Sequence, residues 1–242
     1  MRDPENVLNS LQEHSAQSGY VYDRLYRNLF NREFFLRAYQ NIYASQGNMT
    51  AGTDGKTIDA MSLERIDRLI ATLKDESYQP KPSRRTYIPK KNGKLRPLGI
   101  PSIDDKLVQE VVRMLLEAIY EPTFSTHSHG FRPKRSCHTA LSEIKTTFSG
   151  VQWVIEGDIK ACFDSFDHHV LIDILRRRIK DEHFIALMWK MLKAGYMEQW
   201  IYHHTYSGTP QGSGVSPILA NIYLSELDRY LEEHQKQFLS LI

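Results

Sequence analysis

The 242-residue sequence is poor in cysteine and contains no long hydrophobic run. Its two cysteines, Cys137 and Cys162, lack the CxxC or His/Cys spacing of metal ligands, so we expect reduced, packed thiols without a disulfide or a structural zinc ion. No apolar stretch approaches the roughly 20 residues that span a bilayer, and the start MRDPENVLN lacks signal-peptide character. These absences predict a cytoplasmic protein with no membrane attachment.

Low-complexity tracts, internal repeats and a phosphate-binding glycine loop are absent as well. The last absence argues against an unrelated nucleotide-binding transferase. A hydrophobic content of 41% is enough to bury the core of one large domain or two small lobes. Because helical patterns and a few strand patterns occur without strict alternation, we expect an α+β fold.

The formal net charge of +2 conceals an uneven distribution of charge along the chain. Basic side chains interleaved with aromatic rings are typical of nucleic-acid surfaces, where cations meet phosphates and rings stack on bases. The alternative is that the charges are solvated helix faces and the rings belong to the core. The candidate RNA-binding residues come from three basic groups: Arg24, Arg27, Arg84, Arg85, Lys91, Arg132, Lys134 and Arg135.

Apolar periodicity predicts that helices dominate the first third of the chain, near 4–17, 21–30, 32–45 and 62–76. A β-hairpin follows, because Asn92-Gly93 separates two short strand patterns and this dipeptide suits a type I′ turn. Further helices are expected from Asp104 to Pro122, after Ser136, and from Ser216, with Pro217 in the first helical position. A strand is expected within 200–206.

The segment from Val151 to Ile155 combines β-branched and aromatic residues, which favours a buried strand. Asp158 would then leave the core at the end of that strand. A buried carboxylate needs a charged partner or a metal ion, since an isolated buried anion is costly. Asp164 and Asp167 have a simpler interpretation as caps of the helix that follows.

Four stretches of the sequence together resemble one known family. They are IPKKNGKLRPLGIP (88–101), HGFRPKRSCHTAL (129–141), EGDIKACFDSFDH (156–168) and GTPQGSGVSPILANIYL (208–224). In order and spacing they are similar to the reverse transcriptases of group II introns, the intron-encoded maturase family. GTDGKTID (52–59) extends the resemblance toward the N-terminus. The resemblance implies the right-hand reverse-transcriptase fold, with an N-terminal extension at 1–50, fingers at 51–150 and part of the palm at 151–242.

The resemblance also implies a set of site residues. Asp158 matches the first metal-binding aspartate, and the backbone carbonyl of Ile159 would add an oxygen that suits Mg²⁺. Phe163 matches the ring beneath the sugar that disfavours a 2′-hydroxyl group. Lys90 and Arg96 match the residues that grip the incoming triphosphate, and Gln211 matches a residue near the incoming nucleotide.

The sequence departs from the family in one respect: the Tyr/Phe-Ala-Asp-Asp motif, whose aspartates complete the metal site, is missing. We therefore expect a fragment of a longer protein, inactive on its own. Two functions stay open, namely an RNA-directed DNA polymerase that also assists splicing and mobility, and a maturase that only binds intron RNA. The implied partners are group II intron RNA, an RNA template with a DNA primer, and deoxynucleoside triphosphates. Formation of a homodimer also stays open.

Overall fold

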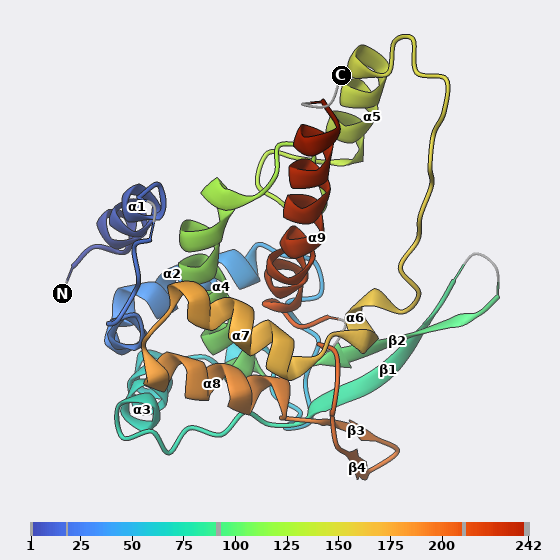
Figure 1. Ribbon diagram of the computed structural model, residues 1–242. Helices are drawn as coiled ribbons and strands as arrows, with labels where there is room; N and C mark the ends of the chain where they lie inside the picture. Colours follow the sequence, from blue (N-terminus) through green and yellow to red (C-terminus); the bar gives the residue numbers. More distant parts are fainter. Residues whose placement is uncertain (1, 18, 91–92, 210–211, 240–242) are drawn as a thin grey trace.

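The computed structural model describes residues 2–17, 19–90, 93–209 and 212–239, with side chains up to residue 234 (Figure 1). Helices form most of the body, and the strands gather at one end. No helix in these ranges is long and apolar enough to cross a membrane. In chain order the elements are α1 Pro4–Ser15, η1 Tyr26–Phe30, α2 Arg32–Tyr43, η2 Ile58–Ala60, α3 Leu63–Lys74, β1 Ser83–Pro89, β2 Leu95–Ile100, α4 Ile103–Tyr120, η3 Glu121–Thr123, α5 Cys137–Thr147, α6 Cys162–Ser165, α7 His168–Arg178, α8 Glu182–Leu192, β3 Tyr196–Glu198, β4 Ile201–His203 and α9 Ser216–Leu239.

Helix α4 is the centre of the hydrophobic core, and it packs against α1, α2 and α9. Leu107, Val111 and Leu115 recur every fourth residue and are fully buried, as the periodicity predicted. Ser102 caps the helix, because its Oγ accepts a hydrogen bond from the Asp105 amide at 3.2 Å. Residues from all three predicted segments contribute to this core.

The predicted N-terminal helices are present, with one difference. The pattern at 21–30 produces only the short 3₁₀ helix η1, since the chain from 20 to 25 is largely irregular. Asn31 then caps α2 by accepting a hydrogen bond from the Glu33 amide at 3.2 Å. Ser62 caps α3 in the same way through the Arg65 amide.

The strands form one sheet in the order β2-β1-β3-β4. The predicted hairpin is confirmed, since β1 and β2 pair antiparallel with Ile88 opposite Arg96. β1 also pairs parallel with β3, placing Ser83 beside Tyr196, and β3 pairs antiparallel with β4. Strand β4 lies within the range predicted at 200–206, and the parallel pairing was not foreseen.

The segment predicted as a buried strand is the clearest correction. Residues 151–159 form neither helix nor strand, and they run as a long exposed connection between α5 and α6 (Figure 1). Trp153, Val154 and Ile155 are 88%, 69% and 99% exposed. A strand needs a neighbour for its backbone hydrogen bonds, and in the described part of the chain none lies beside this segment. Asp158 is therefore exposed, not at the edge of a buried strand.

Four smaller outcomes concern helix starts and the two thiols. Asp167 caps α7, because its Oδ1 accepts hydrogen bonds from the amides of His169 and Val170 at 2.7 and 3.1 Å. Asp164 instead lies inside the short helix α6. Helix α9 begins at Ser216, one residue before the predicted first position. Both cysteines are free thiols, but Cys137 is exposed and not packed as expected.

Candidate nucleotide and nucleic-acid site

The β1–β2 hairpin presents two candidate phosphate-binding residues on one face. Arg96 lies opposite Ile88, and the Lys90 amide donates to the Lys94 carbonyl at 2.7 Å in the same register. Side chains two residues apart on a strand share a face, so Lys90 and Arg96 are diagonal neighbours on the same face. Both residues are exposed. The neighbouring candidate Lys91 lies outside the described residues.

The GTPQGSG loop packs against this same face of the hairpin. At Gly212 a Cβ atom would lie 2.7 Å from the Gly99 carbonyl oxygen and 2.9 Å from Leu98 Cδ1, so only glycine permits this approach. Leu98 is two residues from Arg96 and shares its face. The loop is therefore adjacent to the Lys90 and Arg96 side. Gln211, immediately before Gly212, lies outside the described residues.

The other end of the loop is bound to the segment after Asp158. The amide of Thr209 donates to the Phe163 carbonyl at 2.7 Å, and the amide of Gly208 donates to the Phe166 carbonyl at 2.7 Å. A Cβ at Gly208 would lie 2.4 Å from the Phe163 carbonyl oxygen. The buried His168 completes the attachment, since its Nε2 donates to the Gly208 carbonyl at 2.7 Å. The structure thus joins two motifs about forty residues apart in sequence.

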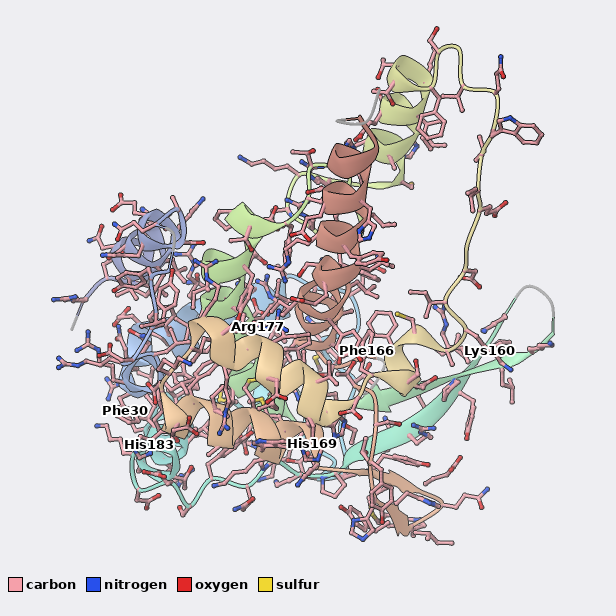
Figure 2. The ribbon with its side chains drawn as sticks, viewed as in Figure 1. Phe30, Lys160, Phe166, His169, Arg177 and His183 are labelled. Carbon is pink, nitrogen blue, oxygen red and sulfur yellow. The ribbon has the colours of Figure 1, made fainter. Side chains whose placement is uncertain are left out.

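Phe163 is half-buried between two other rings. Its centroid lies 6.0 Å from that of Phe131, in the HGFRPKR stretch, and 6.2 Å from that of Phe166, both in edge-to-face geometry. Phe166 and Lys160 lie on either side of α6 (Figure 2). The HGFRPKR stretch therefore also contacts the Phe163 segment. Asn221 of α9 holds this stretch by donating a hydrogen bond to the Gly130 carbonyl at 2.9 Å.

Asp158 lies on the exposed connection, four residues before α6 begins at Cys162. Burial raises the pKa of the Cys162 thiol, and the negative charge of Asp158 raises it further. The backbone turns between them at Ala161, whose φ of 52° is left-handed. In the described ranges no three His, Cys, Asp or Glu side chains come together as metal ligands. Asp158 with the Ile159 carbonyl is chemically suited to Mg²⁺, but these two oxygens do not make up a complete site.

Two residues that position the loop were not predicted from the sequence. Gln109, a buried residue of α4, accepts hydrogen bonds at Oε1 from Ser213 Oγ at 2.9 Å and from the Gly214 amide at 3.3 Å. His168 is the second, through its hydrogen bond to Gly208. The only signal for Gln109 was a polar residue inside an apolar run, and that pattern does not reveal its partner.

Some of the predicted RNA-binding side chains are exposed, and others contact carbonyl groups or a ring of the protein. Arg24 and Arg27 are exposed, form no ion pair with any described residue, and line a groove of about 840 Å³ between α1 and η1. Lys134 is exposed too. Arg84 donates twice to the Ala51 carbonyl, at 3.0 and 2.8 Å, and Arg135 donates to the Ser128 carbonyl at 3.3 Å. The Arg85 guanidinium lies 3.7 Å from the centroid of the Tyr196 ring.

Arg132 is the one described RNA-binding candidate whose side chain is buried. Its side chain is buried and ion-paired with Glu121, with Nε 3.0 Å from Oε1. It also donates to the carbonyls of Ser125 and Ser128 at 2.6 and 2.7 Å, and it lies over the ring of Phe124. With its donors taken by protein acceptors, Arg132 holds the 121–132 turn together and does not present a charge to RNA.

Strand β2 of the hairpin, the glycine loop and the Phe163 segment all lie in the part of the chain that matches a known protein family. Residues 88–241 match the family model described as reverse transcriptase (RNA-dependent DNA polymerase). The chain belongs to this family, in its group II intron-encoded reverse transcriptase and maturase branch.

Individual relatives agree with this assignment. The chain is 50% identical to the group II intron-encoded protein LtrA of Lactococcus lactis subsp. cremoris over 240 residues, which cover 98% of this chain and 40% of that protein. It is 42% identical to protein YkfC of Escherichia coli over 87% of this chain and 57% of that protein. Nuclear intron maturase 1, mitochondrial, of Arabidopsis thaliana is 38% identical over 38% of this chain and 13% of that protein. The chain thus spans about two fifths of the length of LtrA.

A solved structure shares the fold. One chain of a partial Cas6-RT-Cas1–Cas2 complex matches with a TM-score of 0.57 and 21% identity, over 87% of this chain and 35% of that chain. The predicted α+β reverse-transcriptase fold is confirmed.

Proposed function

We propose that this chain forms the nucleotide-gripping part of an RNA-directed DNA polymerase that also binds its intron RNA and assists splicing and mobility. One observation carries the proposal: the hairpin, the glycine loop and the Phe163 segment are held together by close contacts at Gly212 and Gly208. In the same proposal, residues 1–50 are the N-terminal extension, 51–150 the fingers and 151–242 part of the palm.

The roles of the nucleotide-binding residues follow from their chemistry. Arg96 offers planar fork geometry to phosphate oxygens, and Lys90 offers a compact positive charge beside it. Together they would hold the triphosphate of an incoming deoxynucleotide. Phe163 would lie beneath its sugar, and Gln211 would be near the incoming nucleotide.

Asp158 and the Ile159 carbonyl would each give one oxygen to Mg²⁺, and other oxygens would complete its coordination shell. The ion would supply positive charge to the reacting phosphates. Because the described residues do not assemble a group of three or more metal-ligating side chains, we expect this chain by itself to be inactive in DNA synthesis.

The second candidate function is intron RNA binding without chemistry. The groove lined by Arg24 and Arg27 favours it, because these two exposed guanidinium groups form no ion pair with a described residue, although Asp3 and Asp23 also line the groove. In this function the maturase stabilises the folded intron, and Asp158 has no role.

The test of the first function measures nucleotide binding and DNA synthesis separately. A fluorescent deoxynucleoside triphosphate is titrated into the chain and into Arg96→Ala, with Lys74→Gln as the control for the loss of one exposed positive charge. Charge-assisted hydrogen bonds contribute about 1.5–3 kcal/mol, so Arg96→Ala should weaken binding about tenfold or more. Equal affinity in all three proteins would contradict the proposal.

DNA synthesis is then assayed with a longer protein that contains this chain, an RNA template, a DNA primer, deoxynucleotides and Mg²⁺. Splicing assistance without any primer extension would establish the second candidate function instead.

A further inference from the structure

A second groove lies away from the candidate nucleotide site, between the C-terminal end of α8 and strand β4. It measures about 450 Å³, within the size range of sites for small ligands. Trp189 and Tyr202 supply aromatic rings to its lining, and Pro80 and Pro82 supply apolar surface. Two lysines, Lys190 and Lys193, line it as well, and none of the described lining residues is acidic.

The charge of this groove is not neutralised. Lys190 Nζ donates to the backbone carbonyls of Glu76 and Tyr78 at 2.8 and 3.0 Å, and these acceptors carry no net charge. Lys193 Nζ lies 4.5 Å from the centroid of the Trp189 ring, a cation–π contact. Neither lysine is ion-paired with a carboxylate of a described residue. The side chain of Glu76, whose backbone carbonyl accepts from Lys190, is instead paired with His183 at 2.9 Å.

The Trp189 ring of the groove packs against two histidines of α7. Trp189 makes edge-to-face contacts with His169 at 4.9 Å and with the buried His168 at 6.5 Å. His169 belongs to α7, and Figure 2 shows it next to α8. Tyr202 is 41% exposed and stands on β4, opposite Met197 of β3. A flat, exposed ring on a paired strand can accept a stacked base at little cost in conformational entropy.

The groove and the nucleotide site are on one sheet. Tyr202 is opposite Met197, Met197 is opposite Arg84, and Arg84 shares a face of β1 with Lys90. Tyr202 and Lys90 therefore point to the same face of the sheet, with strand β3 between β1 and β4. A nucleic-acid strand near Lys90 and Arg96 can continue toward the groove along this face.

Two simpler explanations account for only part of these features. Lysines near a helix C-terminus compensate the helix dipole, but that dipole is equivalent to about half a negative charge and two full positive charges exceed it. Exposed aromatic residues also occur at protein interfaces, yet such interfaces are depleted in lysine. A phosphate-bearing ligand with an accessible planar group matches both the charge and the rings.

From this geometry we propose that the groove binds an unpaired segment of single-stranded RNA, with a phosphate near Lys190 and Lys193 and a base stacked on Tyr202. A duplex does not suit the groove, because its bases are already stacked and their faces are covered. The inference rests on the proposed role of the chain in nucleic-acid binding. It adds a site that is separate from the candidate nucleotide site and from the α1–η1 groove.

The experiment measures binding of a short fluorescein-labelled oligouridine to the 242-residue chain by fluorescence anisotropy, at about 50 and about 200 mM salt. Tyr202→Leu keeps an apolar side chain but removes the stacking ring, and it should weaken binding about fivefold or more. Lys193→Gln should weaken binding and lower the slope of log affinity against log salt by about 0.7. Lys74→Gln, which removes a lysine from the last turn of α3, is the matched control and should change neither quantity by as much. Thermal unfolding of each variant shows whether the fold is retained.

A second measurement locates the RNA directly. Oligouridine containing 4-thiouridine should crosslink to peptides that contain Trp189 or Tyr202, and the crosslink yield should fall in Tyr202→Leu. Unchanged affinity and unchanged crosslinks in both groove variants would overturn the inference. A change in self-association of Tyr202→Leu with unchanged RNA affinity would show a protein contact and would overturn it too.

The two proposals fail in different ways. If the unsubstituted chain binds RNA and the groove variants bind it equally well, only the groove is wrong. If the groove variants lose RNA affinity but the longer protein makes no DNA, the polymerase proposal is wrong and the groove stands.

Discussion

Gln109 on the central helix accepts a hydrogen bond from Ser213 in the glycine loop, with Oε1 and Oγ 2.9 Å apart. Both side chains are buried, with exposures of 8% and 5%. The same oxygen also accepts the Gly214 amide. The loop beside the Lys90 and Arg96 face is therefore attached to the buried central helix α4.

We predict that Gln109→Leu lowers the free energy of unfolding by about 1–3 kcal/mol, because the Ser213 hydroxyl and the Gly214 amide lose their buried acceptor. Urea unfolding measures the change. Gln12→Leu, at an exposed position of α1, is the control and should lie within about 0.5 kcal/mol of the unsubstituted chain. An equal effect of the two substitutions would show that Gln109 does not hold the loop.

Gly208 should not tolerate a side chain. Its φ of 75° is left-handed, and an added Cβ would lie 2.4 Å from the Phe163 carbonyl oxygen. Gly208→Ala is therefore expected to destabilise the chain by more than about 1 kcal/mol. Gly214→Ala is the matched control in the same loop, because nothing lies within 4 Å of its added Cβ. Comparable stability of the two variants would refute the close contact.

Asp158→Asn should separate synthesis from RNA binding in a longer protein that contains this chain. The amide keeps the shape of the carboxylate and removes the charge that would attract Mg²⁺, so DNA synthesis should be lost. Asp158 is exposed, so folding should change by less than about 0.5 kcal/mol. RNA affinity should be retained, because the free arginines Arg24 and Arg27 lie on the α1–η1 groove. Paired assays of primer extension and splicing decide this prediction, and equal loss in both would contradict it.

The cap of α7 should make folding sensitive to acid. Hydrogen bonds from the amides of Val170 and His169 hold the pKa of Asp167 below its usual value of 3.8. A carboxyl group with a lowered pKa in the folded state stabilises the fold above its unfolded pKa, and this contribution is lost as pH falls through the folded pKa. Asp167→Asn keeps a capping oxygen but does not titrate, so its stability should depend less on pH below about 4. Urea unfolding of both proteins across this pH range, with NMR titration of Asp167, checks the prediction, and parallel pH curves would count against it.

The sequence by itself was sufficient for the elements whose causes are local. Helix α4 follows from four-residue apolar spacing that stops at Pro122, and the β1–β2 hairpin follows from Asn92-Gly93 between two strand patterns. Family membership was also evident from four motifs in order, and comparison with known proteins confirmed it. Periodicity, caps and turns act between residues a few positions apart, so they can be recognised without knowing the fold.

Tertiary structure decided everything that depends on a distant partner. Val151 to Ile155 has the composition of a strand, but strand formation requires a neighbour, and none lies beside it in the described ranges. Arg132 resembled a surface cation until Glu121 and two carbonyls were found around it. Gln109 and Ser213 are 104 residues apart in sequence, and only the packing of the loop on α4 brings them together. A side chain's type states which bonds it can make, but the fold determines which partner is within reach.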